Sequence, residues 1–413
     1  MFKRAEPSYR ILVSDAARGC AVAIIRSLGL QGWHVVAGDS SRPSPGMNSK
    51  YAAERFWYPN PAERPQEFVE ALLAYVKEHQ IDLVIPVTDA TILPLAAARE
   101  RFEPHTKLAI PGSEALAAVT DKQRTIELAE RLGVPVPRTV LVHTAAEAEA
   151  AAAEFAWPVV LKPQASRSYQ TGRAVESYEV TYADNAESLI KQVAAYEGRS
   201  AVLLQEYCAG RGMGVELLLD RGRPLAAFQH ERLREIPLTG GASAFRRSVP
   251  LDDILYDYST RLLAALEWTG LAMVEFKVSP SGEVRLMEIN GRVWGSLPLA
   301  VHSGVDFPAR LVELWLGDQP AGDAQPRADY QVGVRSRNLE LELVWIAKVL
   351  FGSRSAGLLP LPARSAGLRA IGQLMNPWCR FDILSFSDPR PGIAELGKIA
   401  RKFASKGRKG KHS

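Results

Sequence analysis

Short apolar runs alternate with helical patterns over the first 110 residues, and this alternation limits the possible folds more than any other feature of the sequence. Strand patterns cover residues 11–14, 34–39, 82–86 and 107–110, and helical patterns cover residues 18–32, 66–79 and 90–102. Alternating strands and helices build a doubly wound parallel sheet, which binds ligands beyond the carboxyl ends of its strands. The loop after the first strand reads SDAARGCA and lacks the GxGxxG fingerprint of dinucleotide-binding sheets. We therefore predict a Rossmann-like α/β domain that binds neither a nicotinamide nor a flavin dinucleotide.

A second unit with a different order of elements begins near Thr120. Its strand patterns lie at residues 140–142, 158–162, 174–180 and 201–207, and its helical patterns lie at residues 121–132, 145–155 and 186–197. This mixed order predicts an α+β domain. A stretch rich in Pro, Ala and Gly marks the end of the unit. We therefore predict three regions, at residues 1–118, 119–320 and 321–413, the last of them an accessory C-terminal region.

The positive charge of the chain is concentrated at its C-terminal end. The 413 residues carry 50 Lys and Arg against 46 Asp and Glu, which gives a net charge of +4. Residues 398–413 hold seven of the cations and no acidic residue, so the remainder of the chain is slightly acidic. Such a body lacks the basic stripe of nucleic-acid-binding proteins, and we predict no nucleic-acid partner. We expect the basic tail to be solvated and disordered, with docking to an anionic surface as the alternative.

The cysteines and the apolar segments favour a cytoplasmic protein without a membrane span. Cys20, Cys208 and Cys379 are far apart and form no CxxC or Cys/His metal pattern, which is typical of reduced thiols. No export signal is visible at the N-terminus. The most apolar helical stretch, residues 341–351, is much shorter than the ~20 residues that cross a bilayer.

Two strand patterns near residue 280 carry the most informative side chains. In AMVEFKVS, residues 272–279, period-two alternation puts Glu275 on the polar face. In EVRLMEING it puts Glu288 and Asn290 on one side and Met287 on the other. The intervening SPSGE has the composition of a hairpin turn, so we expect the strands to pair and to bring the three polar side chains together. Carboxylate and amide oxygens suit Mg²⁺ with phosphate oxygens completing its shell, whereas an exposed acidic hairpin face is the structural alternative.

Other polar residues stand at the ends of apolar strands or at a helix start. Lys162 ends the run PVVLKP, where a lone ammonium is unfavourable unless it meets an anion. Residues 205–207 end the run AVLLQEY, where unpaired backbone groups can bind the edge of a purine. Lys122 stands at the start of a predicted helix. Taken singly, Lys122 is typical of a solvated helix residue, and Lys162 is typical of a lysine whose stem is buried and whose ammonium reaches water.

Taken in order along the chain, these residues resemble the ATP-grasp superfamily, the fold of biotin carboxylase, carbamoyl phosphate synthetase and D-alanine ligase. The resemblance spans residues 10–318 and implies a pre-ATP-grasp domain, then an ATP-grasp domain with a lid at about residues 138–204. It implies that ATP phosphates contact Lys122 and Lys162, and that Arg292 stabilises a phosphorylated intermediate. It further implies an adenine hinge at Gln205, Glu206, Tyr207 and Cys208. The implied metal ligands are Glu275, Glu288 and Asn290, holding two Mg²⁺ ions or Mn²⁺ in their place.

The sequence departs from the family pattern in the lid and at the ribose. The lid loop QASRSYQTGR has a single glycine, so its phosphate contacts would come from Ser166, Ser168 or Arg167. The acidic residue expected on the ribose has no clear match, and Glu216 is the nearest candidate. The chain also lacks a lysine-centred biotin attachment motif and an amidotransferase region.

One further segment fits relatives that join a carboxylate to an amine, in which a similar segment covers the acceptor. It reads LTGGASAFRRSV, residues 238–249, and places Arg246 and Arg247 after a flexible turn. A guanidinium binds two oxygens of a carboxylate or acyl phosphate at once, whereas a polar hairpin is the structural alternative.

The resemblance implies an enzyme that uses ATP to activate a carboxylate as an acyl phosphate, releases ADP, and joins the acyl group to an amine or thiol. The expected partners are therefore a small-molecule carboxylate and an amine. Two alternatives stay open: a phosphotransferase on the same fold, and a non-catalytic nucleotide-binding protein. His230 and His302 belong to no catalytic pattern in the sequence, and we expect both to be structural.

Overall fold

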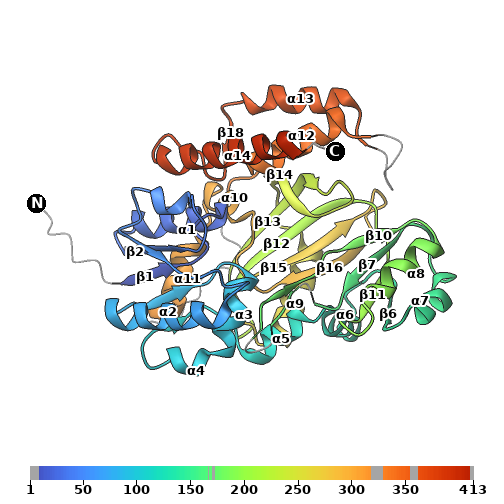
Figure 1. The fold of residues 1–413 in the computed structure, drawn as a ribbon, viewed down its shortest axis with the longest axis horizontal. Helices are drawn as coiled ribbons and strands as arrows, with labels where there is room; N and C mark the ends of the chain where they lie inside the picture. Colours follow the sequence, from blue (N-terminus) through green and yellow to red (C-terminus); the bar gives the residue numbers. More distant parts are fainter. Residues whose placement is uncertain (1–8, 166, 170–172, 318–328, 354–360, 410–413) are drawn as a thin grey trace, which may run out of the picture.

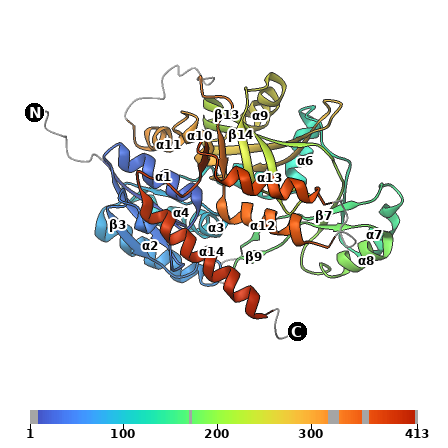
Figure 2. The same cartoon turned by 90° about the horizontal axis from the view of Figure 1, so that it is seen from above.

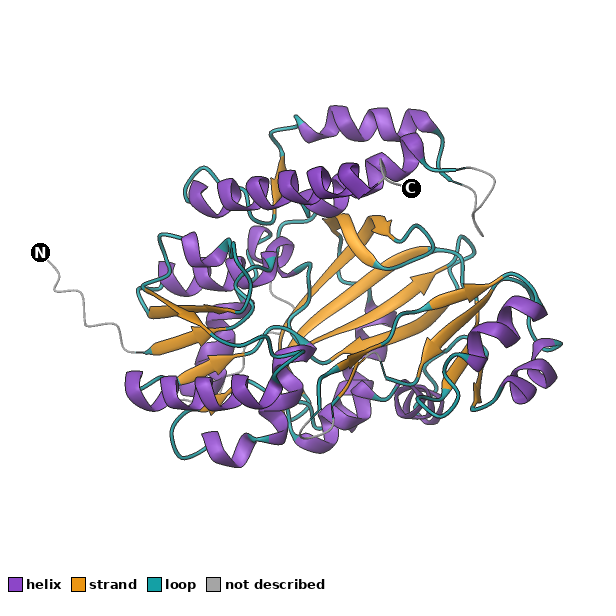
Figure 3. Cartoon of the chain, viewed as in Figure 1, coloured by secondary structure: helices purple, strands orange, loops and turns teal. Residues whose placement is uncertain are grey.

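The computed structural model describes residues 9–165, 167–169, 173–317, 329–353 and 361–409. Three sheets of four or more strands, together with a small two-stranded ribbon, organise these residues (Figures 1 and 3). Helices cover the sheets, and the helices of the C-terminal region lie over one side of the molecule (Figure 2).

The first region forms a five-stranded parallel sheet, as the alternating pattern predicts. Its spatial order is β3-β2-β1-β4-β5. The strands are β1 (Arg10–Val13), β2 (His34–Asp39), β3 (Glu54–Trp57), β4 (Leu83–Ile85) and β5 (Lys107–Leu108). The helices are α1 (Gly19–Leu30), α2 (Pro65–His79), α3 (Asp89–Ala97) and α4 (Arg99–Phe102), with a 3-10 turn η1 (Gly46–Asn48). The predicted helix at 90–102 is therefore divided in two.

Two helices, α5 (Ser113–Thr120) and α6 (Lys122–Arg131), lead into a small antiparallel sheet. Its order is β10-β7-β11-β6, from strands β6 (Thr139–Val142), β7 (Val159–Pro163), β10 (Thr181–Ala183) and β11 (Val202–Glu206). Helices α7 (Ala145–Ala152) and α8 (Ala186–Ala194) pack on it, and the ribbon β8 (Arg167–Ser168) and β9 (Glu176–Ser177) projects from the loop after β7. This unit occupies the range expected for the lid.

The largest sheet has seven strands in the order β16-β15-β12-β13-β14-β17-β18. The strands are β12 (Arg211–Asp220), β13 (Arg223–Ile236), β14 (Ala242–Ser248), β15 (Gly270–Val278), β16 (Val284–Asn290), β17 (Arg335–Arg337) and β18 (Cys379–Phe381). Its helices are α9 (Asp253–Ala265), α10 (Leu297–His302) and α11 (Phe307–Leu316). Beyond these come α12 (Leu339–Phe351), α13 (Arg364–Leu374) and α14 (Pro389–Lys409). Because β17 and β18 extend this sheet, the C-terminal region is structurally part of it.

One hydrophobic core joins the first sheet to the largest one. Ile24 of α1 and Ile11 of β1 belong to the same buried cluster as Trp294 and Phe307. The rings of Trp294 and Phe307 meet edge to face with centroids 5.3 Å apart. Burial of this shared apolar surface fixes the carboxyl ends of the first sheet beside the hairpin of β15 and β16.

The basic tail is helical where the structure describes it, which corrects the expected disorder. Helix α14 runs from residue 389 to 409, and residues 410–413 lie outside the described part. Lys398 and Lys402 both form ion pairs with Glu340 of α12. These contacts and the burial of Ile399 give the helix a packing partner that composition alone does not reveal. In the described ranges, no helix is both long enough and apolar enough to span a bilayer.

Candidate functional site

The hairpin of β15 and β16 brings the three predicted metal-binding side chains together. Glu275 pairs directly with Glu288, and Met273 pairs with Asn290. The turn between the strands is closed by the Ser279 amide, which donates to the Glu283 carbonyl at 2.9 Å. The side-chain amide nitrogen of Asn290, Nδ2, lies 2.9 Å from Glu275 Oε1 and 3.1 Å from Glu288 Oε1. Two carboxylate oxygens are thus within hydrogen-bond distance of one atom.

A β-bulge in this hairpin changes the expected alternation. Glu275 pairs with Glu288 whereas Phe276 pairs with Leu286, so Met287 is an extra residue in its strand. We expected Met287 to lie on the side opposite Glu288, but both line the same cavities. The bulge also frees the Met287 carbonyl from the ladder, and the Lys162 ammonium donates to it at 3.5 Å.

Lys122 and Lys162 are brought to the hairpin by one capping residue. The carboxylate of Asp121 caps α6 by accepting from the amides of Gln123 and Arg124. Its second oxygen accepts from the Gln164 side chain at 2.9 Å, and the Lys122 amide donates to the Gln164 carbonyl at 2.9 Å. The start of α6 is therefore attached to the strand that carries Lys162.

Charge balance at the hairpin depends on burial. Burial lowers the pKa of the Lys162 and Lys122 ammonium groups, and the charge of Glu288 opposes this for both. Burial would raise the pKa of Glu288, but Lys122 and Lys162 outweigh it, so its pKa is lowered and the carboxylate stays ionised. Burial raises the pKa of Glu275, and the Arg232 guanidinium that pairs with it opposes the rise. The pocket thus holds several charges that a polyanion and a cation could compensate.

Strand β11 ends at the position expected for the hinge. The Glu206 amide donates to the Arg138 carbonyl at 3.0 Å, and the side chain of Gln205 is held by the Thr139 hydroxyl at 2.9 Å. Tyr207 and Cys208 then pass along the cavity wall beyond the strand. Burial raises the pKa of the Cys208 thiol to about 11.

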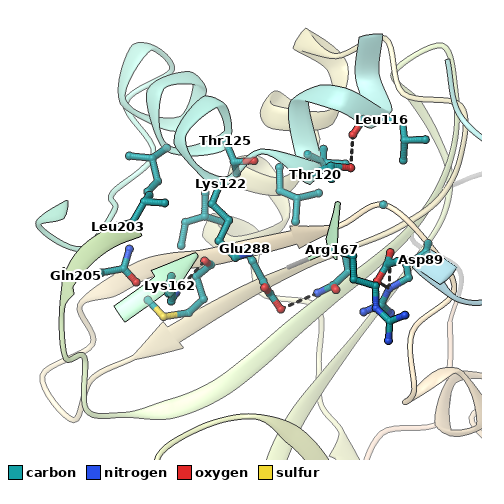
Figure 4. Close-up of a pocket in the computed structure, with 18 of the residues that line it drawn as sticks. Asp89, Leu116, Thr120, Lys122, Thr125, Lys162, Arg167, Leu203, Gln205 and Glu288 are labelled. Atoms are coloured by element: carbon teal, nitrogen blue, oxygen red, sulfur yellow. Dashed lines mark hydrogen bonds and ion pairs between the residues drawn. The ribbon is translucent and has the colours of Figure 1, made fainter. Parts of the chain in front are cut away.

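Two adjoining cavities meet at these residues. The inner cavity is the one drawn in Figure 4, where Lys122, Lys162, Arg167, Gln205 and Glu288 surround one space. The hinge cavity is larger and extends along residues 205–208 and the turn at 239–243. The two share six lining residues: Lys162, Gln205, Met287, Glu288, Asn290 and Arg292.

Arg292 links the site to the first sheet. Its Nε donates to both carboxylate oxygens of Asp89, at 3.0 and 3.1 Å. Asp89 begins α3 just beyond the carboxyl end of β4, which is an edge where we expected ligands to bind. The preceding residue, Gly291, packs closely against Trp268, since a Cβ at Gly291 would lie only 2.4 Å from the Trp268 ring.

The structure places three predicted contact residues away from both cavities. Arg246 is fully buried and paired with Asp382 at 2.5 Å, and Arg247 is paired with Glu231 at 2.7 Å. Both arginines therefore form ion pairs with acidic side chains and line neither of the two cavities. Residues 239–243 of the same segment do line the hinge cavity. Glu216, the third of these residues, also lines neither cavity.

The carboxylate of Glu216 is fully buried, 3.0 Å from His230 Nδ1, and it accepts from the Ser296 hydroxyl at 2.8 Å. It reaches the hinge cavity only through Ser296, so it is not placed to contact a ribose. His230 is likewise fully buried and lines neither cavity. In the lid, Ser166 lies outside the described residues and Ser168 is described only through its backbone in β8, whereas Arg167 lines the inner cavity.

Sequence reasoning missed a charged network on the wall of the hinge cavity. Glu235 lies 3.3 Å from Arg232 and 3.0 Å from Lys277, and all three line that cavity. Irregular pairing of β13 with β14 puts Arg232 and Glu235 on one side, against simple alternation. The charged run HERLREI in an otherwise apolar strand was the available signal.

The donor set fits a divalent cation only together with oxygens from a ligand. Among the described residues, no group of three or more His, Cys, Asp or Glu is placed to hold a metal. Glu275, Glu288 and Asn290 offer two carboxylates and one amide, which leaves most of an octahedral Mg²⁺ shell to water and phosphate oxygens. That is the usual arrangement for Mg²⁺ bound with a nucleotide.

Comparison with known proteins finds similarity over the hinge and the hairpin. A family model described as "ATP-grasp in the biosynthetic pathway with Ter operon" matches residues 199–338. The carbamoyl phosphate synthase large chain of Archaeoglobus fulgidus is 25% identical over 232 residues, which are 54% of this chain and 21% of that one. The D-alanine–D-alanine ligase of Ectopseudomonas mendocina is 28% identical over 208 residues, 48% of this chain and 64% of the ligase. The chain thus spans about a fifth of the first relative and under two thirds of the second.

The fold is also found among solved structures. A biotin carboxylase–ATP complex from Campylobacter jejuni matches with a TM-score of 0.62 and 18% identity, over 79% of this chain and 74% of that one. Residues 199–338 therefore resemble the ATP-grasp family, and the chain shares the fold of the biotin carboxylase. The range matched by the family model includes residues 205–208, the hairpin and Arg292. Lys122 and Lys162 precede that range, and their place beside the hairpin comes from the geometry of α6 and β7.

Proposed function

We propose that this chain is an ATP-dependent ligase that activates a carboxylate and joins it to an amine. The observation that carries the proposal is the meeting of two lysines, two carboxylates and an amide where the two cavities join. In the proposed reaction a carboxylate oxygen of the substrate bonds to the γ-phosphorus of ATP, and ADP leaves. An amine nitrogen then bonds to the acyl carbon, phosphate leaves and the nitrogen loses a proton.

Each group at the site has a role in this proposal. Lys162 and Lys122 bind ATP phosphates, and residues 205–208 border the adenine. Glu275, Glu288 and Asn290 hold Mg²⁺, which supplies positive charge for the phosphates when bound. Arg292 binds the acyl phosphate, where it has to exchange Asp89 for the substrate. Such a reaction depends mainly on positioning and electrostatic stabilisation, so no nucleophilic side chain is required.

Glu235 replaces Glu216 as the proposed ribose contact. It is a carboxylate on the wall of the hinge cavity, and its charge acts on Tyr207 of the hinge. Lys277 and Arg232 keep it in place through ion pairs.

The proposal is tested by the products and by a matched pair of variants. ADP and phosphate should form only when a carboxylic acid and an amine are both present, and a panel of amino acids and hydroxy acids is the first screen. AMP and pyrophosphate as products would refute the ligase. A stable phosphorylated acceptor formed without amine would instead identify a phosphotransferase.

The variant Glu288→Gln should lose Mg²⁺-dependent ADP formation, whereas Glu283→Gln in the exposed turn of the same hairpin should keep it. Equal activity of the two variants would remove Glu288 from the mechanism.

A further inference from the structure

Exposed large apolar side chains gather in the C-terminal region. Of the seventeen such residues in the described part of the chain, ten lie between Phe351 and Phe403. Trp378 is 86% exposed and Met375 is 85% exposed, and Phe386 is fully exposed. Single exposed apolar residues are normal on protein surfaces, whereas a concentration of them marks an interaction site.

Exposed apolar side chains recur at helical spacing on α14 and on α13. In α14 the exposed stripe has spacings of three, four and three residues: Ile393, Leu396, Ala400 and Phe403. In α13 the exposed residues are Leu368 and Ile371, three residues apart, and the exposed Met375 and Trp378 follow after the helix ends. Residues at these spacings share one face of a helix. The opposite faces are also covered, since Ala370 of α13 and Ile399 of α14 are buried against the protein.

Both helices lie on the outer surface of the same side of the molecule. Figures 1 and 2 show α13 and α14 on that side, with α13 against α12 and α14 against η1 of the first region. We call residues 364–403, which contain the exposed apolar residues of both helices, the docking face.

The charges of the docking face have one sign at the surface. Its acidic residues, Asp382, Asp388 and Glu395, are all buried. Its exposed charged side chains are basic: Arg364, Arg369, Arg380, Arg390, Arg401 and Lys402. A second copy of the same face would bring these like charges together, which disfavours a symmetric dimer through it.

We propose that the docking face binds the surface of an anionic phospholipid bilayer. Helices with one protruding apolar stripe and flanking arginines lie in the plane of a bilayer interface, with the stripe among the acyl chains and the cations at the headgroups. The docking face consists of helices that lie on the outer surface. Peptides and small molecules are usually bound in concave sites, so the face is less suited to them. The stripe supplies the apolar contact, and the exposed basic side chains, Arg390 and Arg401 among them, select anionic lipid. The proposal is independent of the ligase reaction.

Flotation of the full chain with vesicles tests the proposal directly. The chain should float with vesicles of phosphatidylcholine and phosphatidylglycerol, remain below with phosphatidylcholine alone, and bind less as salt rises. Ile393→Ser/Leu396→Ser should lower the partition coefficient at least about tenfold, because two apolar anchors are lost. Arg390→Glu/Arg401→Glu should do the same.

The matched controls are Ile254→Ser and Lys191→Glu, which change an exposed apolar and an exposed basic residue on helices outside the docking face, and both should float like the wild type. Tryptophan quenching by lipids brominated in their acyl chains should fall in Trp378→Phe if this side chain enters the bilayer. Unchanged melting curves of all variants show that folding is not the cause.

Three results would overturn the proposal. The first is failure of the wild type to float with anionic vesicles even at low salt. The second is binding of the face variants as tight as that of the two controls, which would show that the face is not the contact. The third is a dimer in ultracentrifugation that Ile393→Ser/Leu396→Ser dissociates, with no vesicle binding, which would assign the face to a second copy of the chain.

Discussion

The buried pair of Arg246 and Asp382 gives a sharp test of where the C-terminal region belongs. Asp382→Ala removes the partner of a guanidinium that has no solvent exposure, and it removes the acceptor of the Ser336 hydroxyl, which lies 2.7 Å from the carboxylate. Leaving one member of a buried ion pair uncompensated costs about 3–5 kcal/mol, and the lost hydroxyl hydrogen bond adds about 1 kcal/mol. We therefore expect the free energy of unfolding to fall by about 5 kcal/mol, which is a large part of the about 5–15 kcal/mol that is usual for a folded protein.

Urea unfolding followed by circular dichroism measures this loss. The matched control is Arg247→Ala, the next residue, whose side chain is 40% exposed and whose loss should cost about 1 kcal/mol or less. The double variant Arg246→Met/Asp382→Leu replaces the pair by apolar groups and should recover most of the stability. It should also retain ATP turnover, because Arg246 does not reach the cavities. A stable double variant without turnover, or a smaller loss in Asp382→Ala than in the control, would refute this reasoning.

Three further predictions concern single side chains. Lys162→Met should weaken ATP binding about 10- to 100-fold in calorimetry, because a charge-assisted contact to a phosphate is lost. The control Lys191→Met, at an exposed position of α8, should leave the affinity unchanged, and equal ATP affinity of the two variants would exclude the phosphate contact. Burial raises the pKa of the Glu395 carboxyl from 4.5 to about 7, so the folded state binds the proton more tightly and the free energy of unfolding falls as pH rises from 4.5 through 7. Glu395→Gln should abolish this pH dependence and raise the free energy of unfolding by about 1–3 kcal/mol above pH 7. An unchanged midpoint of urea unfolding above pH 7 would contradict this prediction. Burial raises the pKa of the Cys208 thiol to about 11, so the rate of its alkylation should still increase above about pH 9. Bound ATP should slow the alkylation, and an unchanged rate with ATP would show that Cys208 does not border the nucleotide.

The fold was predictable wherever an element buries a regular face. The strand at 34–39 and the helix at 66–79 agree with β2 and α2 to within one residue, because apolar side chains recur there at the period of the element. The edge strand β3 was missed, since its four residues are alternately half-buried and exposed and give no apolar run. The accessory region was separated from the largest sheet because β17 has only three residues and two of them are arginines.

The site was predictable only as far as alternation holds. The meeting of Glu275, Glu288 and Asn290 follows from a hairpin with polar residues on one face, and the structure confirms that they are neighbours. The position of Met287 in the cavities was not predicted, because a bulge is a property of pairing between strands and leaves little trace in one strand's sequence. The wrong placement of Arg246 has a related cause, since its buried partner Asp382 lies far along the chain.

The order of strands in the largest sheet has a consequence for synthesis on the ribosome. β14 is made early, but β17, which covers its free edge, follows only after α9, the hairpin, α10 and α11, and β18, which covers the edge of β17, follows only after α12 and α13. Until then the nascent chain presents an unpaired strand edge, the kind of surface that recruits other chains. We expect stalled or truncated products ending before Cys379 to be the species that aggregate or engage chaperones, even though every residue of the proposed catalytic site has by then been translated.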